Sequence, residues 1–106
     1  MQNDLMVFQN QEFGEVRSVM IDGEPWFLGK DIAENLGYRN GSRDINRHVD
    51  NEDKLTERIV LSGQNRETIF INESGLYSLI LSSKLPNARK FKKWVTGEVL
   101  PSIRNK

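Results

Sequence analysis

The chain has 106 residues, with 15 Lys and Arg, 15 Asp and Glu, one His and no Cys, and 37% of it is hydrophobic. The absence of Cys excludes disulfides, thiolate zinc sites and cysteine nucleophiles, and a single His excludes Cys/His metal clusters. Apolar runs are short, such as that of residues 79–81, so no membrane span is expected. We therefore expect one ordered domain over residues 1–106, without a cofactor and without a secretion signal.

The net charge of zero hides an asymmetry along the chain. Residues 1–34 carry two basic and seven acidic side chains, a net charge of −5. Residues 35–106 carry thirteen basic and eight acidic ones, a net charge of +5, and seven of these basic residues lie from Lys84 onward. Charge separated in this way indicates surfaces with different roles.

The first third of the chain alternates apolar and polar residues, which predicts strands at residues 5–9, 15–21 and 24–28. Asp22-Gly23 is a strong signal for a two-residue hairpin turn between the last two strands. The period then lengthens, and residues 30–36 are expected to form a short helix that ends at Gly37.

A second short helix is predicted over residues 43–49, with Ser42 as its N-cap. Two short helices joined by a turn that contains glycine are typical of a helix-turn-helix. A second hairpin follows, with strands at 55–61 and 67–72 around a turn at 62–66. We interpret this hairpin as a wing.

Two helices are expected at the C-terminal end. Ser74 is the predicted cap of a helix over residues 75–83, and Asn87 caps a longer amphipathic helix whose regular part ends at Leu100-Pro101. The predicted fold class is therefore α+β: an N-terminal antiparallel sheet, a helix-turn-helix-like pair, a wing-like hairpin and two C-terminal helices.

Three segments resemble a known family. Residues 25–38, PWFLGKDIAENLGY, resemble the opening signature of the Bro-N domain, the N-terminal module of baculovirus repeated-ORF proteins and of many phage and prophage antirepressors. Residues 70–77, FINESGLY, and residues 88–104, ARKFKKWVTGEVLPSIR, resemble two later stretches of that family, in the same order. The resemblance implies a sequence-specific double-stranded DNA-binding domain at the N-terminus of a longer transcription regulator. Such a regulator is expected in the cytoplasm, that of the bacterial host where a phage or prophage encodes it.

The second short helix and the turn before it offer groups that can read DNA. Arg39, Arg43 and Arg47 recur every four residues, and Asn46 lies between the last two. The Arg fork makes paired hydrogen bonds to guanine and to phosphate, and Asn can read adenine in the same way. We assign Arg43, Asn46 and Arg47 to base edges, beside a helix N-terminus that can bind a phosphate.

The last helix carries Arg89, Lys90 and Lys93 opposite its apolar arc, and these residues are assigned to phosphates. The tip of the second hairpin adds Arg66. The full set of candidate DNA-binding residues is Arg39, Asn40, Ser42, Arg43, Asn46, Arg47, Arg66, Arg89, Lys90 and Lys93.

Less specific interpretations of these residues stay open. The basic positions can be solvated faces, and Asp44 makes the face of the second helix less than purely basic. Asp22, Glu24 and Asp31 are interpreted as solvated surface, and His48 as a structural or surface residue. No nucleophile–base pair, phosphate loop or metal cluster is found, so we do not expect an enzyme.

The rival hypothesis is a protein-interaction module that binds and inactivates a repressor protein, with the acidic first third as its docking surface. A homodimer would suit a palindromic operator. The sequence shows no dimerisation stripe.

Overall fold

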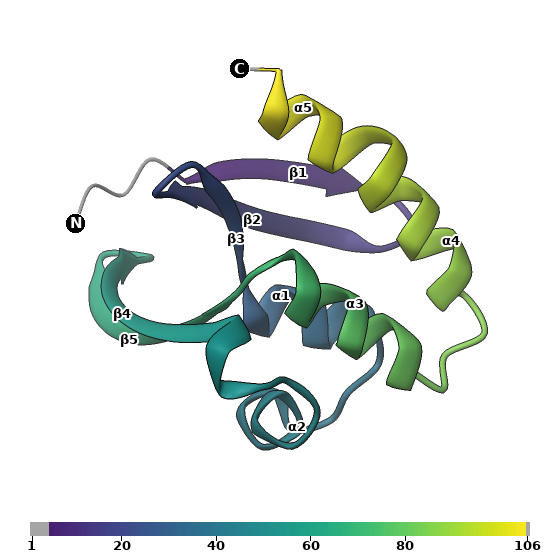
Figure 1. Cartoon of the computed structure of the whole chain (residues 1–106), viewed down its shortest axis with the longest axis horizontal. Coiled ribbons are helices and arrows are strands. Elements are labelled where there is room, and N and C mark those ends of the chain that lie inside the picture. The colour runs from purple at the N-terminus through teal and green to yellow at the C-terminus, as the bar shows by residue number, and fades with distance from the viewer. Residues whose placement is uncertain (1–4, 106) are drawn as a thin grey trace.

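The computed structural model describes residues 5–105. Five strands form one antiparallel sheet in the order β1-β2-β3-β5-β4 (Figure 1). The strands are β1 (Met6–Asn10), β2 (Gly14–Ile21), β3 (Glu24–Leu28), β4 (Lys54–Leu61) and β5 (Gln64–Ile71). The first three strands form a meander, and β5 joins it by pairing with β3 at only two positions, Phe27↔Ile71 and Leu28↔Phe70. The rest of the β4–β5 hairpin projects from the sheet.

The helices lie between and after the strands. They are α1 (Gly29–Asn35), α2 (Gly41–His48), the 3₁₀ turn η1 (Asn51–Asp53), α3 (Glu73–Ser82), α4 (Ala88–Trp94), the π-helical turn η2 (Val95–Val99) and α5 (Leu100–Arg104). This arrangement confirms the predicted α+β class. Within residues 5–105, no helix is both long enough and apolar enough to cross a membrane.

Two hydrophobic clusters hold these elements together. The larger joins the sheet to the helices and includes Phe27, Leu76, Phe91 and Val99, all with no exposed surface. The smaller, with Trp26, Ile59 and Phe70 among its members, lies between the curled strands. The aromatic residues Trp26, Phe27 and Phe70 of the sheet and Phe91 and Trp94 of α4 are therefore core residues.

The β2–β3 and β4–β5 hairpins each turn through two residues. Asp22 and Gly23 adopt φ angles of 52° and 82°, which confirms the predicted turn. Ser62 and Gly63 adopt 52° and 77°, so the second turn is shorter than the predicted segment 62–66. Leu61 pairs directly with Gln64, and the strand begins there. The prediction failed because residues 64–66 are polar, which is typical of a loop. They are polar here because they form an exposed end of β5.

The predicted N-caps of two helices are wrong. Asn40, two residues before Ser42, caps α2 by accepting a hydrogen bond from the backbone N–H of Arg43 at 3.0 Å. Asn72, two residues before Ser74, caps α3 by accepting one from the N–H of Gly75 at 2.9 Å. Asn and Ser are both good N-caps, and the choice between neighbouring candidates depends on the path of the preceding chain.

The predicted end of the last helix at Leu100-Pro101 is also wrong, because the helix continues as α5 to Arg104. The π turn η2 lies just before the proline, and the N–H of Leu100 bonds to the carbonyl of Val95, five residues back. Pro101 then falls in the first turn of α5, where its missing N–H costs little.

The sequence indicated that Asp31 is solvated, and this interpretation is wrong. The side chain is buried, with 5% of its surface exposed. Its carboxylate accepts hydrogen bonds from Nε of Arg17 at 2.9 Å, from a terminal nitrogen of the same guanidinium at 2.8 Å, and from the Arg17 backbone N–H at 2.9 Å. The pair fastens α1 to β2. Asp22 and Glu24 are exposed, as predicted.

Candidate nucleic-acid interface

The helix α2 is fixed to the fold by its buried side. Ile45 and Val49 are 1% and 4% exposed and lie in the larger core cluster. Asp44 also turns inward: it is 8% exposed, and its carboxylate accepts the backbone N–H of Asn40 at 3.3 Å. The sequence had placed Asp44 on the outer face. With Asp44 turned inward, the exposed face of α2 is more basic than expected and carries Arg43, Asn46 and Arg47.

Three arginines surround one hollow beside α2. Arg39, Arg43 and Arg47 line a surface depression of about 460 Å³, together with Lys84 from the segment after α3. Arg43 lies 3.7 Å from the Asp44 carboxylate but stays 69% exposed. Within residues 5–105, no carboxylate lies within ion-pair distance of Arg39 or Arg47. Their charges are therefore available to an anionic ligand.

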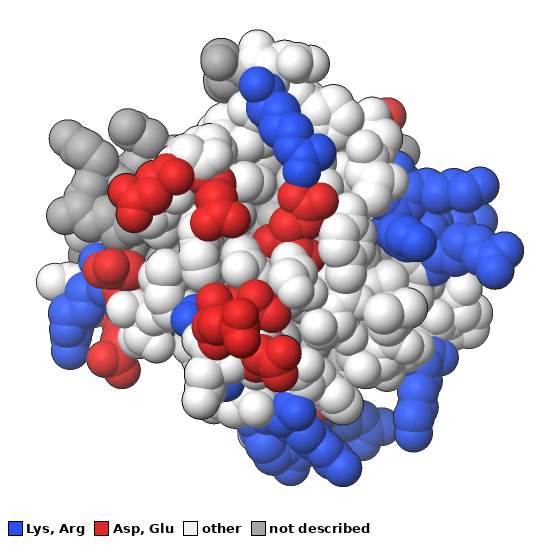
Figure 2. Space-filling model, viewed as in Figure 1, with Lys and Arg blue, Asp and Glu red and all other residues white. Residues whose placement is uncertain are grey.

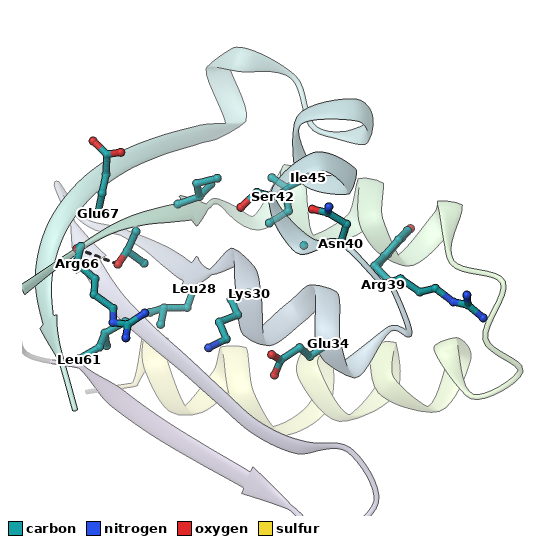
Figure 3. Close-up of a pocket in the computed structure, with 14 residues that line it drawn as sticks. Leu28, Lys30, Glu34, Arg39, Asn40, Ser42, Ile45, Leu61, Arg66 and Glu67 are labelled. Carbon is teal, nitrogen blue, oxygen red and sulfur yellow. Dashed lines mark hydrogen bonds between the residues drawn. The ribbon is translucent and has the colours of Figure 1, made fainter. Parts of the chain in front are cut away.

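A second hollow lies between α1, the start of α2 and β5 (Figure 3). It measures about 450 Å³, and its polar lining includes Arg39, Asn40, Ser42 and Arg66. Arg39 lines both hollows and so links them. The apolar part of the lining comprises Leu28, Ile45, Leu61 and Ile69. The fold thus brings the predicted hairpin residue Arg66 to the same depression as the turn before α2.

Lys30 lines this second hollow as well, although the sequence had suggested no role for it. It lies on α1 with Glu34 four residues later, and Figure 3 shows both side chains at the same side of the depression. The available signal was the position of Lys30 on the α1 face opposite Ile32, Ala33 and Leu36. This position predicts that Lys30 is exposed, but it does not predict that the side chain lies beside β5.

Asn46 is engaged within the protein. Its side-chain oxygen accepts a hydrogen bond from Nζ of Lys54 at 2.8 Å. Paired recognition of adenine needs both the oxygen and the nitrogen of the amide. A base contact by Asn46 therefore either uses the second lone pair of this oxygen or displaces the Lys54 ammonium, which can turn toward a phosphate. Lys54, at the start of β4, was not identified from the sequence.

The basic residues of α4 form a separate group. Arg89, Lys90 and Lys93 are exposed, while Phe91 and Trp94 on the other side of the helix are buried. Neither hollow beside α2 is lined by α4 residues. Figure 2 shows Lys and Arg over α4 at the right edge and around α2 at the bottom, with a third group between them near the end of α3. The basic groups thus occupy adjoining edges of the molecule.

Acidic side chains occupy the face that these edges border. In Figure 2 they gather over η1 and the start of α3. Glu73 of α3 is paired with Arg104, whereas Asp50 and Glu52 near η1 are exposed. A polyanion would be repelled by this face and attracted by the edges.

His48 is a half-buried residue at the end of α2, and its ring lies 5.7 Å from that of Tyr38. The Tyr38 hydroxyl donates to the backbone carbonyl of Leu79 at 2.7 Å, and burial raises the pKa of Tyr38 above its ordinary value of 10.0. These contacts give both side chains a structural role that links α2 to α3. No group of three or more His, Cys, Asp or Glu side chains within residues 5–105 is arranged to hold a metal ion.

The structure defines a small α+β domain in which a helix-turn-helix-like pair and a projecting hairpin surround a basic surface. Residues 15–101 match the model of the BRO family, N-terminal domain (Bro-N). The chain belongs to this family. No solved structure matches it.

Several curated proteins are similar to this chain in sequence. Bro-N domain-containing protein 289L of Invertebrate iridescent virus 6 is 35% identical over 93% of this chain and 28% of its own length. An uncharacterized protein of Haemophilus influenzae is 41% identical over 77% of this chain and 41% of its own length. Uncharacterized Bro-N domain-containing protein L2 of Acanthamoeba polyphaga mimivirus is 30% identical over 95% of this chain and 46% of its own length. The chain thus spans less than half of each relative.

Proposed function

We propose that this domain binds double-stranded DNA without catalysing a reaction, with α2 and the turn before it in a groove. The observation that carries the proposal is that Arg39, Arg43 and Arg47 all line one hollow, in which Asp44 is the one acidic lining residue among residues 5–105. Three guanidinium groups on one short helix and its preceding turn match the charge and hydrogen-bonding pattern of phosphates and guanine edges.

The α4 residues Arg89, Lys90 and Lys93 have a different part in this proposal. They lie on an adjoining edge and contact phosphates without reading sequence. The β4–β5 hairpin, with Arg66 at the second hollow, acts as a wing. The domain is the DNA-binding part of a transcription regulator of the antirepressor type, which works in the cytoplasm and reads a palindromic site as a dimer.

Fluorescence anisotropy with duplexes of random and of genomic sequence, between 50 and 200 mM salt, tests the proposal. Replacing Arg43 and Arg47 together by Gln is expected to weaken binding to the preferred site at least about tenfold, because each base contact contributes about 1–3 kcal/mol. The control replaces Arg58 and Arg104 together by Gln, which changes the net charge by the same amount. Both arginines are exposed and line neither hollow. Equal effects of the two double variants would contradict a site at α2.

The alternative is binding and inactivation of a repressor protein, for which the sequence suggested the acidic first third as the docking surface. The acidic face over η1 and the start of α3 (Figure 2), which lies outside that third, offers a second surface for it. This alternative is favoured if the wild-type domain binds no duplex at 50 mM salt and instead binds a purified repressor. Charge reversal at Glu52, which is exposed on that face, would then weaken the complex.

A further inference from the structure

The two edges of the sheet differ in composition. In the order β1-β2-β3-β5-β4, the strands β1 and β4 each have one strand neighbour within the described residues. An unpaired edge presents free N–H and C=O groups, and proteins commonly protect such edges with charged residues or proline. The edge strand β4 carries Lys54, Glu57 and Arg58, whereas β1 has the sequence MVFQN, without a charge or a proline. Of the two terminal strands in the described part of the chain, β1 is therefore the one without such protection against pairing with another strand.

A groove runs along this unprotected edge. It measures about 700 Å³ and lies between β1 and the last helical segment. One wall is formed by Val7, Phe8 and Gln9 of β1. The other wall comprises Trp94, Gly97, Glu98, Val99, Pro101, Ser102 and Asn105. A strand edge that faces a helix across a groove is the arrangement in which an extended peptide adds to a sheet.

The helical wall is low where a further strand would pass. Gly97 is exposed, and a Cβ atom at this position would meet no atom within 4 Å. Pro101 and Ser102, one turn later, are also small. Gly97 lies in the π turn η2, and π turns are frequent at functional sites. The irregular helix therefore leaves room for a second backbone beside β1.

The charge of the groove selects the occupant. Among residues 5–105, Glu98 is the only charged residue of the lining. Beyond the end of β1, Glu12 and Glu15 are exposed as well. The apolar lining residues Phe8 and Trp94 suit an apolar side chain at every second position of an added strand.

We propose that the groove between β1 and the η2–α5 helix binds an extended segment of a protein partner, rich in alternating apolar and basic residues, which adds to the sheet as a sixth strand beside β1. In Figure 1, β1 and α5 lie at the top of the molecule and α2 at the bottom. The groove shares no residue with the two hollows beside α2. The inference is thus independent of the DNA site, and the domain can hold both partners at once.

Selection from a phage-displayed library of random twelve-residue peptides on the immobilised domain tests this proposal. Enriched peptides are expected to alternate apolar residues with Lys or Arg. A synthetic copy of the most enriched peptide should shift the amide NMR signals of β1 and η2 and slow hydrogen exchange at every second residue of β1. DNA affinity, measured with and without the peptide, is expected to change less than about twofold.

Two variants locate the site. Gly97→Leu fills the groove and should weaken peptide binding at least tenfold, whereas Thr96→Leu, at an exposed neighbour outside the lining, should not. Glu98→Lys should invert the selection toward peptides with Asp or Glu, which keeps the test decisive if Gly97→Leu does not fold. The proposal is overturned if no peptide is enriched or if the peptide binds both leucine variants equally. It is also overturned if the amides of β1 are already protected from exchange by self-association of the domain without peptide.

Discussion

The ion pair of Arg17 and Asp31 shows how one residue can fix the position of an element. Asp31 is 5% exposed, and its carboxylate receives three hydrogen bonds from Arg17, two from the guanidinium and one from the backbone. The hydrogen bond to Asp31 is the main cause that raises the pKa of Arg17 above its ordinary value. Glu15 contacts the same guanidinium at 3.2 Å but is 44% exposed. The two carboxylates therefore share one partner and differ in burial.

Replacing Asp31 by Asn is expected to destabilise the domain by about 3 kcal/mol, because Arg17 then keeps a partly buried charge without its main partner. Glu15→Gln is the matched control, and solvent screening limits its effect to about 0.5 kcal/mol. Urea unfolding monitored by Trp fluorescence measures both values. Equal losses would show that burial of Asp31 does not strengthen the pair.

Sequence patterns predict the environment of an apolar residue better than that of a polar one. Phe27, Trp94 and Val99 lie among apolar residues at strand or helix spacing, which favours a core position, and all three are buried. Asp31 and Asp44 were assigned to the surface, and both are buried. An acidic residue in a first helical turn suits the helix dipole whether or not it has a partner. Its burial depends on a group such as Arg17, fourteen residues away, which only the folded chain brings near.

At the scale of elements, the start of α2 depends on two polar side chains. Asn40 accepts the N–H of Arg43, and Asp44 accepts the N–H of Asn40, so the two polar side chains close the first turn reciprocally. Asn40→Ala is expected to cost about 1 kcal/mol of stability, because the cap is lost. Ser42 lies two residues later and is exposed, so Ser42→Ala should change stability by less than about 0.5 kcal/mol.

Urea denaturation of the two alanine variants measures these stabilities, and amide hydrogen exchange of α2 shows where the loss occurs. The expected result is faster exchange in the first turn of α2 for Asn40→Ala only. A larger effect of Ser42→Ala would restore the cap that the sequence indicated.

The kinds of element were easier to predict than their ends and their pairing. Alternation of apolar and polar residues predicts the strands, and Asp22-Gly23 predicts the turn between β2 and β3. The apolar arc of α4 predicts that helix. The helix beyond Pro101 was missed, because a π turn leaves no local mark in the sequence. The joining of β5 to β3 was missed as well, because two residue pairs, Phe27↔Ile71 and Leu28↔Phe70, unite hairpins that are far apart in the chain.

At the scale of the whole molecule, zero net charge is compatible with a polyanionic ligand because the charges are separated in space. Lys and Arg gather at the edges over α4 and around α2, while acidic residues occupy the face that these edges border (Figure 2). The sequence predicted the separation of charge along the chain. It did not show that acidic residues of the later part, such as Glu52 and Glu73, contribute to the acidic face.

The spatial separation of charge predicts a measurable salt dependence. Each phosphate contact releases counterions and steepens the plot of log affinity against log salt by about 0.9. If α4 lies on the DNA backbone, replacing Lys90 and Lys93 by Gln should reduce the slope by about 1.8 and weaken all duplex sequences alike, because these contacts carry no sequence information. Anisotropy titrations with one preferred and one random duplex measure the slope.

The control for this prediction is the double variant at Arg58 and Arg104, which lowers the net charge equally but lies on β4 and α5. Its slope should stay within experimental error of the wild type, since screening confines each charge to about 10 Å at 0.1 M salt. Equal slopes for both double variants would mean that the domain responds only to total charge. If replacing Lys90 and Lys93 weakens binding to the preferred duplex alone, α4 instead lies at base edges and α2 on the phosphates.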